Sequence, residues 1–157
     1  MSNILKNSDE LIALADIIKY VRNHDLDISY INEVLKLLSP SNVDSYVTQK
    51  GRYIAAFIPQ YTCIKTSVDN INNWLDINVK DIDEIYDVKD INMLKSYLFL
   101  FLITHEIEHS YQYLMARGIV EVPSRIIKYG YRGIYDLLLK SESIIPRPIK
   151  EMKTFLS

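Results

Sequence analysis

The sequence predicts an α+β fold that is mainly helical and carries one small three-stranded antiparallel sheet. Helical spacing of apolar residues occurs towards both ends of the chain, and a segment rich in Tyr, Ile, Val, Phe and Thr lies at 44–68. The stretch 97–117 begins with seven apolar residues and contains no proline or glycine, which is typical of a long helix. The length of 157 residues fits one domain, 1–157, with its own core.

Residues 1–40 are expected to form a helical hairpin that serves as scaffold. Asn7 or Ser8 can cap the first helix, and Ser29 can cap the second. Pro40 lies just past the second helix, and the residue before a proline disfavours helical backbone. The second helix is therefore predicted to run from about Tyr30 to Leu38.

Short breaks separate three segments of strand-like composition: 44–49, 52–58 and 61–67. Lys50-Gly51 forms the first break, and Pro59-Gln60, with proline at a favoured turn position, forms the second. This pattern predicts an antiparallel meander. An exposed edge strand of such a sheet could hold an extended peptide as an added strand, and a sheet that only covers the core fits the pattern equally well.

The remaining chain is predicted to be helical with interruptions. Asp69 can cap a short helix, and 81–86 can form another. A long helix is predicted over 90–117, with Asp90 as its cap and a glycine just past its end. A further helix is predicted over 124–141.

The long helix carries the most informative motif, His105-Glu106-Ile-Glu-His109. Residues four apart lie one above the other on a helix, so both imidazoles point to the same place. Glu106 lies beside them. This H-E-x-x-H pattern offers two nitrogen ligands for zinc and a carboxylate that can take a proton from water.

Polar side chains in so apolar a helix need partners, because unpaired buried charge is costly. A metal ion is the simplest partner for two histidines and a glutamate. Alternatively, these residues pair with one another or face solvent. Gln112, three residues after His109, is either a partner of the metal ligands or part of a polar surface, and Glu108 is expected to point away from the metal.

A third ligand is needed, since hydrolytic zinc sites usually have three protein ligands and a water. If the helix 124–141 folds back antiparallel on the long helix, Asp136 lies level with the histidines and is the first candidate. Glu142 would lie about two turns too far and ranks second. His24 is expected to be a helix-terminal cation instead. The third ligand could also lie outside these 157 residues or be absent.

The motif residues resemble those of the zincin metallopeptidases, whose active-site helix carries H-E-x-x-H. The resemblance implies a zincin-like domain in which His105 and His109 bind Zn²⁺ and Glu106 is the catalytic general base. It implies peptide-bond hydrolysis by a metal-activated water. The metzincin extension is missing, because no histidine follows His109. The chain is therefore most similar to small gluzincin-like or aspzincin-like proteins of bacterial, phage or mobile-element genomes, with a carboxylate as third ligand.

The whole chain limits the partners further. A net charge of −2 argues against a general nucleic-acid binder. The single cysteine, Cys63, excludes an internal disulfide and is expected to be a buried structural thiol. No signal-peptide pattern is visible and the longest apolar run, 97–103, is too short for a bilayer. We therefore expect a cytoplasmic protein that acts on a peptide or protein, without nucleic-acid or membrane partners.

Two other classes of function remain open from the sequence. The chain could be a catalytically inactive binding or regulatory module on a zincin scaffold. It could also be a helical scaffold protein in which the motif arose by chance.

Overall fold

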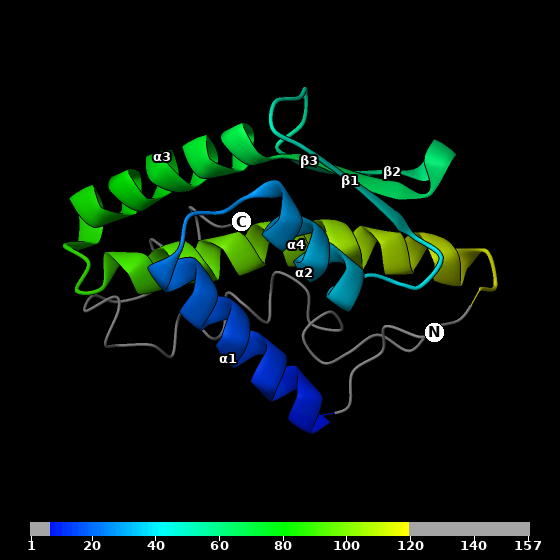
Figure 1. The fold of residues 1–157 in the computed structure, drawn as a ribbon, viewed down its shortest axis with the longest axis horizontal. Coiled ribbons are helices and arrows are strands. Elements are labelled where there is room, and N and C mark those ends of the chain that lie inside the picture. Colours follow the sequence, from blue (N-terminus) through cyan, green and yellow to red (C-terminus); the bar gives the residue numbers. More distant parts are fainter. Residues whose placement is uncertain (1–6, 120–157) are drawn as a thin grey trace.

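The computed structural model describes residues 7–119, which fold as α+β in the order α1, α2, β1, β2, β3, α3, α4. The longest element, α4, spans Ile91–Ala116. It runs along the long axis of the fold in Figure 1, with α3 and the sheet on one side of it. All three other helices contact α4, as do β2 and β3. Helix α4 is therefore the element on which the described fold is assembled.

Local signals at both ends of α4 agree with the prediction for 90–117. The Asp90 side chain caps the helix by accepting the backbone N–H of Met93 at 3.0 Å. Gly118 follows the last turn with φ of 75°, a backbone conformation that favours glycine. Although α4 is long and largely apolar, none of the described helices has the length and hydropathy needed to cross a membrane.

The first two helices are α1 (Asn7–Asn23) and α2 (Ile28–Leu38). Helix α2 begins earlier than predicted, because its cap is Asp27 and not Ser29. The Asp27 carboxylate accepts the backbone N–H of Tyr30 at 2.8 Å. A carboxylate at this position also interacts favourably with the positive end of the helix dipole, which explains why the start moves to the aspartate.

The sheet is mixed, so the predicted antiparallel meander is wrong. Its strands are β1 (Asp44–Thr48), β2 (Ala55–Ile58) and β3 (Cys63–Ser67), in the spatial order β1-β3-β2. Strand β1 pairs parallel to β3, whereas β2 pairs antiparallel to β3. Strand β2 is consequently an edge strand, and it lies against α4.

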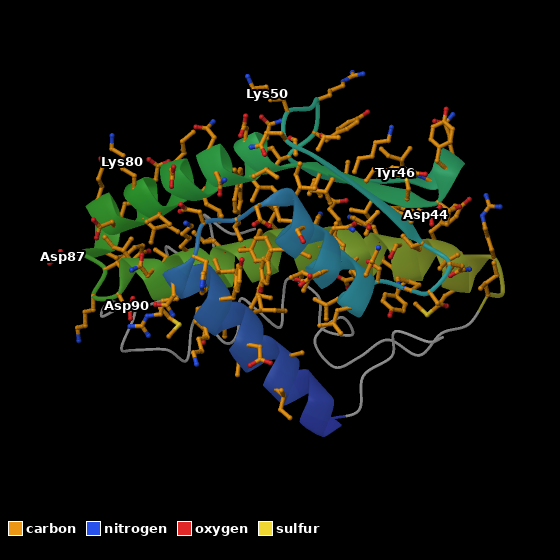
Figure 2. All side chains as sticks on the ribbon, in the orientation of Figure 1. Asp44, Tyr46, Lys50, Lys80, Asp87 and Asp90 are labelled. Carbon is orange, nitrogen blue, oxygen red and sulfur yellow. The ribbon has the colours of Figure 1, made fainter. Side chains whose placement is uncertain are left out.

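The connection between β1 and β2 explains the difference from a meander. The Tyr53 carbonyl accepts the Ser67 hydroxyl at 2.6 Å, and the Gly51 carbonyl accepts the Asn70 amide at 2.8 Å. Lys50, labelled at the top of this loop in Figure 2, projects away from α4. The loop is thus anchored at the last residue of β3 and the first turn of α3, and it leads the chain to the opposite edge of the sheet. A tight Lys50-Gly51 hairpin would instead have kept β2 beside β1.

The antiparallel turn between β2 and β3 was predicted correctly. A short 3-10 turn spans Pro59–Tyr61, and Pro59 is its first residue. Thr62 then has a left-handed backbone with φ of 47°, and its N–H donates to the Pro59 carbonyl at 3.2 Å. This compact turn fixes the register of β2 on β3.

Helix α3 spans Val68–Tyr86 as one continuous element, whereas two short helices were predicted. Its fully buried residues include Ile71, Leu75 and Ile82, at spacings that keep them on one face. This uninterrupted face explains why the acids between them do not end the helix. Asp87 ends it with φ of 52°, and the following turn leads to α4 (Figure 2).

Candidate metal centre on α4

The H-E-x-x-H motif lies in the C-terminal half of α4, on a partly exposed strip of this mostly buried helix. His109 is exposed and His105 and Glu106 are half-buried, while Ile107 and Ser110 between and beside them are buried. The motif residues are therefore not buried charges. A need to neutralise buried charge, expected from the apolar sequence around the motif, does not by itself require a metal here.

The two histidine side chains converge as the i, i+4 spacing predicts. Their Nε2 atoms lie 3.2 Å apart, and the ring planes make an angle of 87° with centroids 4.7 Å apart. A tetrahedral zinc with Zn–N bonds of about 2.0–2.1 Å separates two ligand nitrogens by roughly 3.3–3.4 Å. The pair therefore fits two ligand positions of such an ion, and His109 gives it access to solvent.

Glu106 connects the motif to the sheet. Its Oε2 accepts the backbone N–H of Phe57 in β2 at 2.9 Å. Because this N–H donates to Glu106, it is not part of the β2–β3 ladder and lies on the free edge of β2. One carboxylate oxygen is thus held by the edge strand. This contact is absent from the sequence-based prediction.

Aromatic rings pack along the same side of α4 beside the motif. The Phe57 ring lies 5.5 Å from the Tyr113 ring, and the guanidinium of Arg117 lies 4.4 Å from the centroid of Tyr113. Towards the N-terminal end of α4, the Phe101 and His105 ring centroids are 6.5 Å apart. Of these contacts, the one between Phe57 and Tyr113 packs β2 against α4.

Gln112 is a direct neighbour of the histidine pair. Its Oε1 lies 3.2 Å from His109 Nδ1, the ring nitrogen opposite the one that faces His105. Gln112 is thus exposed and at the same time contacts His109, a predicted ligand.

The third ligand is not found among residues 7–119. Within this part of the chain, no group of three or more His, Cys, Asp or Glu side chains could hold a metal ion. Both predicted candidates, Asp136 and Glu142, lie outside the described residues. His24, the remaining histidine, follows α1 directly and contacts its last turn, with Nδ1 3.1 Å from the Tyr20 carbonyl oxygen and its ring stacked on that of Tyr20.

A separate hollow of about 710 Å³ lies over the outer face of the sheet, and no motif residue lines it. Tyr46 and Tyr61 border it with exposed rings, and Lys65 lies over the ring of Tyr61 at 5.8 Å. Cys63 contributes a fully buried thiol to its floor, and burial raises the pKa of that thiol. This agrees with the structural role predicted for Cys63, because reactive cysteines usually have a lowered pKa.

Comparison with known proteins supplies no relative. The chain matches no protein-family model, no curated protein and no solved structure.

Proposed function

We propose that this chain is a zinc-dependent peptidase in which His105 and His109 are metal ligands and Glu106 is the general base. The observation that carries the proposal is the separation of 3.2 Å between the two Nε2 atoms, which matches a shared tetrahedral ion. The zinc itself would supply a Lewis acid that polarises the scissile carbonyl and lowers the pKa of the attacking water. A carboxylate, Asp136 first and Glu142 second, is proposed as the third ligand.

The position of Glu106 supports a role in proton transfer. Its Oε2 is held by the Phe57 N–H, which orients the carboxylate. In the proposed reaction, Glu106 takes a proton from the attacking water and delivers it to the nitrogen of the leaving amine. One peptide bond and one water thereby give a carboxylate and an amine.

The free edge of β2 supports a peptide as the substrate. Backbone groups on this edge alternate, so Ala55 presents its N–H and C=O on the same side as Phe57. An extended peptide that adds to this edge is brought beside Glu106, because that carboxylate already contacts the strand. The proposed substrate is therefore an unfolded or extended segment.

Metal measurements on purified full-length chain test the proposal. We expect one zinc per chain, and we expect His105→Ala and His109→Ala to lose it. His24→Ala is the matched control, since His24 is bonded to its own helix and should leave zinc content unchanged. Equal zinc content in all three variants would show that the motif does not bind metal, as a helical scaffold protein predicts.

A second measurement separates a peptidase from the inactive module considered above. Zinc-loaded chain should cleave unstructured peptides, and Glu106→Gln should strongly reduce cleavage while retaining zinc. A chain that binds zinc through His105 and His109 but cleaves no peptide library would be a binding module. Within the described residues, the histidine pair has no third ligand to distinguish these outcomes.

A further inference from the structure

The contact between His109 and Gln112 determines which histidine nitrogen can bind a metal. An imidazole ligand must present a nitrogen lone pair, and the proton must therefore sit on the other nitrogen. In this fold the Nε2 atoms of His105 and His109 face each other, while His109 Nδ1 lies 3.2 Å from Gln112 Oε1. An amide oxygen is only an acceptor, so a hydrogen bond in this arrangement requires that His109 Nδ1 carries the proton and donates it to Gln112.

Without metal, the same argument places the protons of the two histidines on different ring nitrogens. If His109 is protonated at Nδ1, its Nε2 is an acceptor. The separation of 3.2 Å between the Nε2 atoms then corresponds to a hydrogen bond in which His105 Nε2–H donates to His109 Nε2. His109 is thus already in its ligand form, whereas His105 must move its proton from Nε2 to Nδ1 before it can bind the same ion.

We infer that Gln112 is a positioning residue of the metal centre: it holds His109 in the Nδ1–H form and fixes the direction of its Nε2 lone pair. This inference rests on the proposed function for the identity of the bound group, but the tautomer itself does not depend on a metal. His109 and Gln112 are both exposed, so without Gln112 the ring keeps only its contact with His105 and can exchange tautomers through water. Partners of this kind tune metal affinity through the ligand they orient.

Nitrogen NMR of protein labelled at histidine tests the inference directly, in metal-free protein at a pH of about 9. We expect His109 as the Nδ1–H tautomer and His105 as the Nε2–H tautomer. In Gln112→Met, which keeps the side-chain length and removes the acceptor, we expect His109 to populate Nε2–H. Gln112→Glu restores an acceptor oxygen and should restore the Nδ1–H form.

Gln60→Met is the matched control, because Gln60 is exposed and lies in the turn between β2 and β3, outside the motif helix. It should leave both histidine signals unchanged. The inference is overturned if wild-type His109 is already in the Nε2–H form. That result would mean that the NH₂ group of Gln112, and not its oxygen, faces His109 Nδ1. It is equally overturned if Gln112→Met leaves the His109 tautomer as it is in the wild type.

Zinc titration of the same variants gives the second readout. We expect Gln112→Met to weaken zinc binding by about 10- to 100-fold, and Gln112→Glu to bind within a few-fold of the wild type. Zinc should move the His105 proton from Nε2 to Nδ1 and leave the His109 tautomer unchanged. If the wild type binds no zinc, the proposed peptidase function fails. The NMR comparison still decides whether Gln112 sets the state of His109.

Discussion

Glu106 of α4 accepts the backbone N–H of Phe57 of β2 at 2.9 Å, which joins the H-E-x-x-H motif to the free edge of the sheet. The two residues are 49 positions apart in the chain. The contact brings the proposed general base and the proposed peptide-binding edge together. It also makes Glu106 part of the packing between α4 and the sheet, so substitutions at this position affect both chemistry and stability.

Replacing Glu106 separates these two roles. Glu106→Gln keeps an acceptor oxygen for the Phe57 N–H but loses the base, so cleavage should fall by about 100- to 10,000-fold with little change in Tm. Glu106→Ala also loses the hydrogen bond. It should lower the free energy of unfolding by about 1.5 kcal/mol, the low end for a hydrogen bond to a charged acceptor, because Glu106 is half-exposed. Peptide-cleavage rates and denaturant unfolding measure the two effects.

Glu108→Gln is the matched control for these variants, since it makes the same change two residues further along α4. It should alter neither cleavage nor Tm. Equal loss of activity in Glu106→Gln and Glu108→Gln would remove the assignment of Glu106 as the base.

The edge of β2 gives a prediction about substrate binding. Ala55→Pro removes a backbone N–H from the free edge without breaking the ladder to β3, because proline is tolerated on edge strands. For a long unstructured peptide we expect KM to rise about 10-fold, which corresponds to about 1.4 kcal/mol, with zinc content unchanged. Steady-state kinetics and metal analysis check both expectations.

Ala56→Pro provides the contrast, because the Ala56 N–H lies on the side of β2 that pairs with Lys65 of β3. This variant should lower Tm clearly, whereas Ala55→Pro should not. If Ala55→Pro leaves KM unchanged, the substrate does not add to this edge.

Stability at alkaline pH should depend on Tyr30. Burial, followed by the neighbouring Tyr20, Glu33 and Asp16, raises the pKa of Tyr30 from 10.0 to about 12. A raised pKa means that the fold favours the neutral phenol, so the stabilisation is fully present below pH 10 and is lost as pH rises through about 12. Between these values the urea midpoint of the wild type should fall more steeply than that of Tyr30→Phe.

The Tyr30→Phe change keeps the ring, whose centroid lies 3.6 Å from that of Tyr20, and removes only the ionisable group. Tyr46→Phe is the matched control, because Tyr46 is 54% exposed. Its urea midpoint should follow that of the wild type at every pH. Parallel curves for Tyr30→Phe and the wild type would show that Tyr30 does not contribute.

Local signals in the sequence predicted the features of α4 that depend on near neighbours. The Asp90 cap, the glycine after the last turn and the convergence of His105 and His109 all follow from residues within one or two turns of each other. The same local rules misplaced the start of α2, since two residues there can act as caps. They also divided α3 in two, because the acids after Leu75 resemble a helix start.

Contacts between distant segments could not be predicted in this way. Pairing of β1 with β3 depends on the loop anchored by Ser67 and Asn70, which no turn pattern reveals. The Phe57–Glu106 contact uses a backbone N–H, a group that every residue except proline has, so no side-chain type marks it. Gln112 was recognisable from its place three residues after His109, but its bond to Nδ1 required coordinates.

The third ligand is the remaining test of the metal centre. Two imidazoles fill two of the four positions of a tetrahedral zinc, and a hydrolytic site needs one more protein ligand while the last position stays open. An antiparallel helix over 124–141 would bring Asp136 level with His105 and leave Glu142 about two turns away. We therefore expect Asp136→Ala to reduce zinc affinity sharply in full-length chain, and Glu142→Ala to leave it nearly unchanged, as measured by competition with a chelating dye.

The reverse ranking would mean that the helix is shifted or broken, as Gly133 would allow. If neither variant changes the affinity, both candidates are wrong, and the histidine pair must take its third ligand from elsewhere.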